Sequence, residues 1–375
     1  METPALAREI LDRSLRGYRL LRWFIRVATQ VFFRRIEVSG LEEVPSDGAV
    51  IFCGNHPNSL LDPILITAYC GRIVHFAAKD VLFSNPLLRI LMRIAGAVPV
   101  RRAKDHGGGA VDNSEMFETM YAVLASGRAT GIFPEGISHD RSELAPLKTG
   151  AARMAFGVKK RHPETRVYVV PTGLVYFDRN RFRSNVLIQF GPPIEIDAAR
   201  IATEEADSKG AAREMTELID SRLRALTINA EHWNRVWVLD CVRRLYQPAK
   251  VSLEERVRVT RRFHLAYPKV KDEADVRSLY RRVESFLVRK AAIGVDDKTL
   301  RGELNTFRGL LGVLGNVLLL AVHLPLFLLG APVHVPLGLA LKYAGRHLAP
   351  RSDVVATTKF LGGVLSVVAV YSSLS

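Results

Sequence analysis

Short apolar runs alternate with longer amphipathic segments between residues 35 and 200. Runs rich in Val, Ile and Phe predict strands, and segments with apolar residues three or four positions apart predict helices. The predicted strands are Ile36–Val38, Ala49–Cys53, Val74–Ala78, Ala97–Val100, Thr130–Phe133, Val167–Thr172 and Val186–Phe190. The predicted helices are Pro63–Tyr69, Pro86–Ala95, Asn113–Ala125 and Thr149–Lys160. This alternation is typical of an α/β domain with a largely buried sheet.

Before this region, residues Ala5–Phe33 have the pattern of one amphipathic helix. Leu21, Phe24, Ala28 and Val31 share an apolar face, and Arg19, Arg22 and Arg26 share a basic face. Such a helix can lie in a membrane interface with its arginines toward anionic headgroups. It can equally pack on its own domain with the arginines in solvent. The pattern leaves both interpretations open.

The chain changes character after residue 200. Residues 201–303 are helical in pattern and dense in charge, which is typical of solvated helix faces or of a surface that faces anionic headgroups. Residues Gly309–Leu341 then contain no Asp, Glu, Lys or Arg over 33 positions. A membrane-spanning helix needs about 20 apolar residues, so this segment exceeds one span and falls short of two.

Prolines determine the topology that we expect for this apolar segment. Three lie in its second half: Pro325, Pro332 and Pro336. Because proline breaks or kinks a helix, we expect one span followed by an interfacial or re-entrant turn. A last apolar run, Phe360–Tyr371, has about 12 residues and is too short to span a membrane alone. These patterns divide the chain into an amphipathic helix (1–34), an α/β domain (35–200), a charged helical region (201–306) and membrane-associated segments (307–375).

Composition narrows the class of partner. The 375-residue chain is 48% hydrophobic and carries a formal net charge of +15. The positive charge predicts an anionic partner, which can be lipid headgroups, phosphorylated small molecules or nucleic acid. The chain has no zinc-finger spacing, no aromatic-rich RNA-binding signature and no heptad repeat. Nucleic acid is therefore the disfavoured class.

Cysteine usage and the N-terminal residues indicate a compartment. The three cysteines, Cys53, Cys70 and Cys241, are scattered and odd in number, so they predict no disulfide framework. The first 35 residues carry eight arginines and show no signal-peptide pattern. We therefore expect a reducing location, at the cytoplasmic face of a membrane.

A polar island interrupts the apolar runs at residues 54–63, which read GNHPNSLLDP. His56 follows the end of a predicted strand, and Asp62 lies six positions later. A carboxylate can fix the tautomer of a histidine and stabilise its imidazolium, while the other ring nitrogen removes a proton from a substrate hydroxyl. The alternative is a helix-capping side chain beside a surface histidine.

Three further blocks extend this pattern: Phe76–Phe83 with Gly96–Arg102, Gly131–Arg141 with Lys148, and Val169–Gly173. In order and spacing, the four blocks over about residues 40–200 resemble the phospholipid/glycerol acyltransferase (PlsC-type) family. The resemblance implies a mixed sheet flanked by helices, and direct acyl transfer without a covalent acyl-enzyme or a cofactor. The spacing of the histidines and cysteines predicts no metal site.

The resemblance also implies roles for individual residues. His56 would be the general base on the acceptor hydroxyl, and Asp62 would orient it. Glu135 and Gly136 would hold the glycerol backbone and shape the loop. Basic side chains would bind the acceptor phosphate or the thioester carrier, because guanidinium and ammonium groups bind phosphate well. The candidates are Arg101, Arg102, Arg141, Lys79 and Lys148.

Two departures from the common pattern indicate a branch of the family. Most bacterial lysophosphatidate acyltransferases of the family place one residue fewer between the histidine and the aspartate. After Gly136 this chain reads ISHDR, so the arginine expected two places after the glycine is missing, and Arg141 is the nearest substitute. Both features, with the DVVATTK sequence at Asp353–Lys359, resemble the glycerol-3-phosphate/dihydroxyacetone-phosphate acyltransferase branch.

We therefore expect a membrane-associated O-acyltransferase of phospholipid biosynthesis. Its donor would be acyl-CoA or acyl-ACP, and its acceptor glycerol-3-phosphate or dihydroxyacetone phosphate. One alternative is acylation of a lysophospholipid such as 1-acylglycerol-3-phosphate. Another is an inactive scaffold that binds lipid at the membrane surface, against which the intact pair of His56 and Asp62 argues. The apolar segment at Gly309–Leu341 argues against nucleic acid as a partner.

Overall fold

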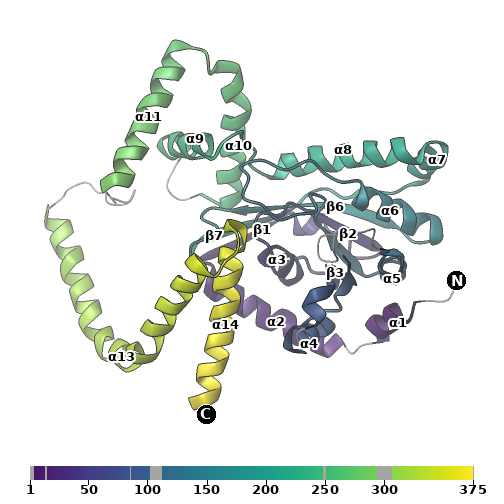
Figure 1. Cartoon of the computed structure of the whole chain (residues 1–375). Coiled ribbons are helices and arrows are strands. Elements are labelled where there is room, and N and C mark those ends of the chain that lie inside the picture. Colours follow the sequence, from purple (N-terminus) through teal and green to yellow (C-terminus); the bar gives the residue numbers. More distant parts are fainter. Residues whose placement is uncertain are drawn as a thin grey trace.

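A mixed β-sheet lies at the centre of the protein (Figure 1). The computed structural model describes residues 4–12, 15–84, 86–101, 112–247, 251–293 and 306–374. The sheet has eight strands in the order β1-β7-β6-β2-β5-β3-β4, with β8 paired to β6. Their bounds are β1 Arg35–Ser39, β2 Ala49–Gly54, β3 Val74–Lys79, β4 Val98–Val100, β5 Ala129–Ile132, β6 Val167–Tyr176, β7 Asn185–Phe190 and β8 Ile194–Glu195.

The strand directions bring the candidate residues to one edge. Strands β6, β2, β5, β3 and β4 are parallel to one another, whereas β7 and β8 are antiparallel to β6 and β1 is parallel to β7. The carboxyl ends of the five parallel strands therefore meet, and this edge is where ligands bind in α/β sheets. His56 follows β2, Phe133 follows β5, and Lys79 ends β3.

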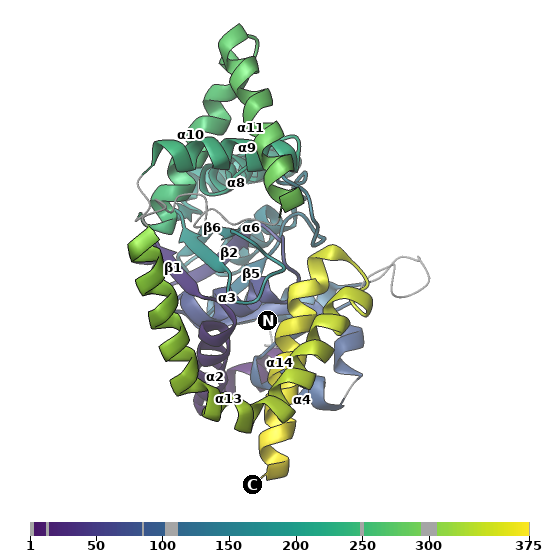
Figure 2. The same ribbon diagram turned by 90° about the vertical axis from the view of Figure 1, so that its left-hand side faces the viewer.

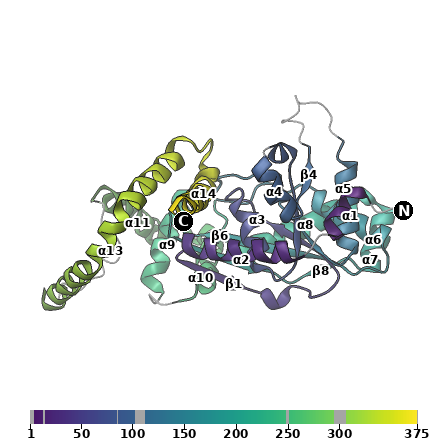
Figure 3. The same ribbon diagram turned by 90° about the horizontal axis from the view of Figure 1, so that it is seen from below.

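Helices cover both faces of the sheet (Figures 1 and 3). One face packs against α2 (Leu15–Phe32) and α3 (Leu61–Tyr69), with Phe52 in that core. The other packs against α1 (Ala5–Asp12), α5 (Ser114–Ala125), α6 (Gly150–Arg161) and α8 (Ser208–Leu226), with Ile51 in that core. Neighbouring residues of β2 thus point to opposite cores, as the alternation of a strand requires. The remaining short elements are η1 Leu41–Glu43, η2 Asp80–Phe83, α4 Pro86–Ile94 and α7 Ala198–Ala206.

The predicted elements of the α/β region are confirmed. All seven strands and all four helices expected between residues 35 and 200 are present. Strand β6 continues four residues past the expected end at Thr172, and β8 was not predicted. Helix α8 follows residue 200 yet buries Met215 and Leu223 in the same core as Ile51, so packing continues across that expected boundary. The division of the chain into domains stays a prediction.

Beyond α8 follow α9 (Trp233–Tyr246), α10 (Leu253–Val270) and α11 (Ala274–Ile293). A charge cluster joins the first two, in which Asp240 accepts hydrogen bonds from Arg243, Arg244 and Arg256. Burial acts to raise the pKa of Asp240, but the three guanidinium groups outweigh it and lower that pKa to about 2. The ionised carboxylate therefore ties α9 to α10.

The N-terminal region differs from the single helix that the sequence predicted. It forms two helices, α1 and α2, with residues 13 and 14 between them outside the described part of the chain. Part of the basic face of α2 packs on the domain, because Arg26 Nε donates to the carbonyl of Ala68 at 2.7 Å and the guanidinium lies over the Tyr69 ring. Several apolar side chains of α2 are exposed instead: Leu20, Trp23, Phe24, Val27 and Val31.

The apolar C-terminal segments form α13 (Thr306–His347) and α14 (Val355–Leu374), joined by η4 (Ser352–Val354). Helix α13 continues through all three prolines where the sequence predicted a break, and Figures 1 and 2 show that it bends on its path. Proline is the usual cause of such kinks. Two stretches are long and apolar enough to cross a membrane, Phe327–His347 and Ser352–Ser373. We expected the last apolar run, Phe360–Tyr371, to be too short to span a membrane. This was wrong, because α14 begins before Phe360 and includes polar residues, so that the helical stretch is longer than the apolar run.

Candidate active site

His56 and Asp62 form a hydrogen-bonded pair at the carboxyl end of the parallel strands. The ring Nδ1 lies 2.8 Å from Asp62 Oδ2. Within the described part of the chain, Nε2 makes no hydrogen bond, and the side chain is 17% exposed. A histidine with one nitrogen on a carboxylate and the other available has the geometry of a general base and its orienting group.

Further donors fix the Asp62 carboxylate. The backbone N–H of Asn58 donates to Oδ2 at 2.7 Å, and the hydroxyl of Tyr176 donates to Oδ1 at 2.6 Å. Burial raises the pKa of Asp62, while its bonds to His56, Tyr176 and Asn58 act in the opposite direction. Burial and the neighbouring carboxylate raise the pKa of Tyr176 well above 10, so its hydroxyl stays protonated and donates.

The loop between the two residues has an unusual backbone. Ser59 adopts φ +49°, in the left-handed region that residues other than glycine seldom occupy. The turn is closed by the N–H of Leu61, which donates to the carbonyl of Asn58 at 3.1 Å. This conformation accommodates the five residues between His56 and Asp62. The Asp62 carboxylate, in the first turn of α3, therefore lies beside the His56 ring.

Aromatic rings restrict the imidazole from one side. The ring of His56 stacks on Phe133 with centroids 4.1 Å apart, and Phe133 stacks on Phe76 at 5.8 Å. Phe133 follows β5 and Phe76 lies in the adjacent strand β3. Together with the Asp62 bond, this stack leaves the imidazole little rotational freedom.

Glu135 ties three segments of backbone together. Its Oε1 accepts the N–H of His56 at 2.8 Å, and its Oε2 accepts the N–H of Ala145 at 2.7 Å and contacts His139 Nε2. The residue is 4% exposed. Both carboxylate oxygens are therefore engaged by the chain itself, so this residue positions the loop around His56. Its predicted contact with the glycerol backbone stays a prediction.

The adjacent residues Ser138, His139 and Asp140 turn to three different partners. Ser138 Oγ donates to Asp353 Oδ2 at 2.5 Å, His139 contacts Glu135, and Asp140 pairs with Arg179. They form no catalytic triad, although their order in the sequence spells one. The N–H of His139 also donates to the His56 carbonyl at 3.2 Å, which fastens this loop to the loop of the base.

Gly136 allows a lysine to cross the loop. It adopts φ +74°, and a Cβ added there would lie 2.7 Å from Lys148 Nζ. The Lys148 backbone is fixed by its N–H, which donates to the carbonyl of Pro134 at 2.8 Å. This places an exposed ammonium group against the turn that follows β5, at the edge that carries His56.

The structure disperses the other predicted cations. Lys79 ends β3 and Arg101 follows β4, both exposed and both at the carboxyl edge of the sheet. Arg141 is exposed and its backbone N–H donates to His139 Nδ1 at 3.2 Å. Arg102 lies outside the described residues, as does the Gly107–Gly109 loop. Phosphate binding by these residues stays a prediction.

Two family models match the chain. The model described as Acyltransferase covers residues 35–175, and the one described as Glycerol-3-phosphate acyltransferase 2 C-terminal domain covers residues 238–371. Residues 35–175 therefore form an acyltransferase-type domain. The first match contains His56, Asp62 and Glu135, and the second contains the segment that bonds to Ser138.

The chain is similar to two yeast proteins and, over part of its length, to one solved structure. Glycerol-3-phosphate O-acyltransferase 2 of Saccharomyces cerevisiae is 35% identical over 50% of this chain and 25% of its own length, and glycerol-3-phosphate O-acyltransferase 1 is 28% identical over 68% and 36%. The chain therefore spans about a quarter to a third of these yeast relatives. A solved structure, the acyltransferase PlsC of Thermotoga maritima, is 20% identical with a TM-score of 0.39, over 56% of this chain and 85% of that chain.

Several residues that contact the loops around His56 were missed by sequence reasoning. Tyr176 lies at the end of β6, and Arg179 follows it and donates to the carbonyl of Pro57 at 3.1 Å. Arg351 donates to Ser138 Oγ at 2.9 Å, so a guanidinium reaches the position where the expected arginine is missing. The position of Tyr176 at the end of a buried strand could have indicated its role from the sequence. No local pattern in the sequence indicates the contact of Arg351 with Ser138.

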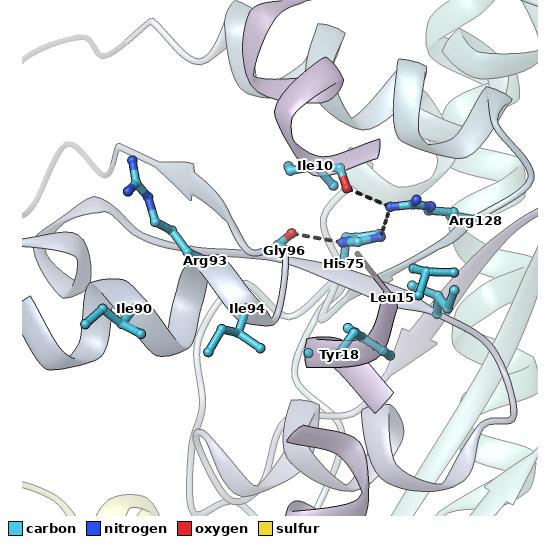
Figure 4. A pocket seen from close by; sticks show the side chains of 11 residues that line it. Ile10, Leu15, Tyr18, His75, Ile90, Arg93, Ile94, Gly96 and Arg128 are labelled. Atoms are coloured by element: carbon cyan, nitrogen blue, oxygen red, sulfur yellow. Dashed lines mark hydrogen bonds between the residues drawn. The ribbon is translucent and has the colours of Figure 1, made fainter. Parts of the chain in front are cut away.

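A separate cavity of about 410 Å³ lies between α1, α2 and α4 (Figure 4). Its polar groups are used internally: His75 Nδ1 is 3.0 Å from the carbonyl of Gly96, and Arg128 donates to the carbonyl of Ile10 at 2.9 Å. Tyr18 and Ile94 are also among the residues that line it (Figure 4). None of the predicted site residues lines this cavity, and its bonds hold α1 against the sheet edge of the acyltransferase domain.

Proposed function

We propose that the protein transfers a fatty acyl group from acyl-CoA or acyl-ACP to glycerol-3-phosphate or dihydroxyacetone phosphate in phospholipid biosynthesis. The observation that carries this proposal is the His56–Asp62 pair, held in a loop of acyltransferase type at the carboxyl edge of the sheet. The acceptor is supported by the printed function of the yeast relatives and by the second family model.

One base is enough for both proton transfers of the reaction. His56 Nε2 takes the proton of the acceptor hydroxyl while the oxygen attacks the thioester carbon. The C–O bond forms, the C–S bond breaks, and the departing thiolate takes the proton from His56. Asp62 stabilises the imidazolium between the two proton transfers. No covalent acyl-enzyme, cofactor or metal takes part in this sequence.

The acceptor phosphate needs cations near the base. Lys148 lies against Gly136, and Arg351 donates to Ser138. Gly136 and Ser138 belong to the turn after β5, and the residue after Ser138 donates its N–H to the carbonyl of His56. Guanidinium can bind phosphate through two parallel hydrogen bonds, whereas ammonium acts as a point charge. We place the phosphate between these two groups, with the predicted cations Lys79, Arg101 and Arg141 farther out along the edge.

An acceptor panel tests the proposed function. Purified protein in detergent receives a long-chain acyl-CoA or acyl-ACP with glycerol-3-phosphate, dihydroxyacetone phosphate or lysophosphatidate, and thiol release and lipid products are measured. We expect turnover of glycerol-3-phosphate at least equal to that of lysophosphatidate. Turnover of lysophosphatidate alone would contradict the acceptor. Vesicle binding without any thioester consumption would identify an inactive scaffold.

We also propose that the protein sits on the cytoplasmic face of a membrane. Helices α2 and α4 lie on the side of the sheet toward which α13 and α14 extend (Figures 1 and 2), and both carry exposed apolar residues, among them Ile90 and Ile94 of α4. Clustered apolar surface of this kind fits a lipid interface. Cys53 and Cys70 are buried and form no disulfide, which agrees with a reducing compartment.

Tryptophan fluorescence measures which face meets the lipid. The chain has three tryptophans, so replacing Trp233 and Trp237 with phenylalanine leaves Trp23 as the sole reporter. In vesicles containing brominated lipid, we expect strong quenching of Trp23. The matched control keeps only Trp237, on α9 at the other side of the sheet, and is expected to be quenched much less (Figure 1). Stronger quenching of Trp237 than of Trp23 would contradict this orientation.

A further inference from the structure

The C-terminal segment Arg351–Phe360, here called the C-terminal clamp, returns to the active site. It comprises η4 and the first turns of α14, and it bonds to three loops at the carboxyl edge of the sheet. These loops follow β2, β5 and β6, and the clamp bonds to them at Asn58, Ser138 and Asn180. A segment close to the chain end therefore contacts each loop that surrounds His56.

The contact with the first loop lies closest to the chemistry. Thr357 is 3% exposed, and its hydroxyl donates to the carbonyl of Asn58 at 3.1 Å. The N–H of the same Asn58 donates to Asp62 Oδ2, the oxygen that also binds His56 Nδ1. The carbonyl belongs to the peptide that precedes Ser59, whose positive φ makes this loop sensitive to loss of a restraint.

The second contact fixes the loop after β5. The carboxylate of Asp353 is 3% exposed and accepts bonds from Ser138 Oγ at 2.5 Å and from the Arg351 guanidinium at 2.8 Å. Arg351 bonds to Ser138 as well, which closes a three-membered network. The buried carboxylate thus holds the exposed Arg351 guanidinium against Ser138, where the proposed acceptor phosphate would bind.

Packing keeps the clamp in place. Ala356 is 0% exposed and Phe360 is 5% exposed, within the core that contains Phe52. The Phe360 ring meets Phe32 of α2 edge-on, with centroids 5.5 Å apart. Lys359 Nζ donates to the carbonyl of Asn180 at 2.7 Å. The first turns of α14 are therefore built into the acyltransferase domain.

We propose that Thr357 and Asp353 are positioning residues of the acyl transfer reaction, which act through Asn58 on the His56–Asp62 pair and through Ser138 on the acceptor side. This inference rests on the proposed function. The clamp completes the active site from outside the α/β region, and it connects the catalytic loops directly to the apolar helix α14. The full site forms only when the C-terminal segment is docked.

The test compares two buried threonines, one in the clamp and one outside it, in the full-length protein. Thr357→Val keeps the shape of the side chain and removes its hydroxyl, and we expect kcat to fall by about tenfold, because one buried hydrogen bond is lost. The KM for both substrates should stay within about twofold, since Thr357 contacts neither. Thr357→Ser should restore most of kcat. The matched control is Thr260→Val in α10, whose buried hydroxyl donates to the carbonyl of Arg256 within its own helix at 2.8 Å and whose loss should leave kcat unchanged.

A second variant tests the acceptor side. Asp353→Asn removes the charge that holds Arg351, and we expect an increase of about tenfold in the KM for a phosphorylated acceptor, with a smaller change for the thioester. Assays use whichever acceptor of the panel the wild-type protein acylates, so an error in the acceptor does not obscure the result. Wild-type kcat in Thr357→Val would overturn the proposal. If Thr357→Val lowered kcat only together with a clear decrease in Tm, and serine did not restore kcat, Thr357 would have a purely structural role. That result would also overturn the proposal.

Discussion

Replacing His56 with alanine is expected to lower kcat by about 100- to 10,000-fold, the usual contribution of a well-placed general base. Nε2 is the atom positioned to take the hydroxyl proton, because Nδ1 is occupied by Asp62. Thiol release from an acyl thioester, in the presence of the acceptor that the wild-type protein acylates, measures the loss. The KM for both substrates should change little, since the proposed phosphate ligands are other residues.

A second histidine provides the control for this substitution. His162 caps the end of α6 and lies outside the site, so His162→Ala should leave kcat close to that of the wild type. The melting temperature of the His56 variant, measured in the same detergent, shows whether its fold is intact. A correctly folded His56→Ala protein that keeps more than about a tenth of wild-type kcat would contradict the role of His56 as general base.

Replacing Asp62 with asparagine should cost nearly as much. The variant loses the charge that stabilises the imidazolium, and its amide can hold the ring in the wrong tautomer, so we expect a decrease in kcat of about 100-fold or more. Initial rates of the two proteins at saturating substrate give the ratio. An amide has nearly the same shape as a carboxylate, and because the side chain is fully buried the surface is unaltered.

Tyr176, which donates to the other oxygen of Asp62, tests how much a single hydrogen bond to this carboxylate contributes. Tyr176→Phe removes one donor to Asp62 and keeps the charge, so we expect a smaller decrease in kcat, of about tenfold. The order of the two variants is the informative result. If Tyr176→Phe were slower than Asp62→Asn, the carboxylate would not act mainly through its charge on His56.

The sequence predicted the sheet and the His56–Asp62 contact because both depend on local pattern. Strands buried on both faces appear as continuous apolar runs, and the runs around β2, β3, β5 and β6 were found within a few residues of their true ends. His56 and Asp62 lie six positions apart in one turn, so their contact follows from a short stretch of chain.

Contacts between distant segments were not predictable in this way. Glu135 meets the His56 backbone across 79 positions, and Thr357 meets Asn58 across 299, which depends on the path of the entire backbone. The DVVATTK sequence had been connected with a branch of the family, but its bonds could not be derived from its composition. Helix α2 shows a related limit, because part of its basic face found carbonyl and aromatic partners on α3 while its apolar residues stayed exposed.

The two halves of α14 have different surroundings, and this matters for producing the protein. Leu365, Val367, Val368 and Tyr371 in its second half are all about half exposed, whereas its first turns are buried in the domain. A protein that ends before Arg351 would lack the exposed apolar surface of α14 and should be more soluble. It would also lose the hydrogen bonds of Thr357 to Asn58 and of Asp353 to Ser138. A shortened protein intended to keep its activity should end after Phe360, retaining the first turns of α14 and dispensing only with the exposed ones.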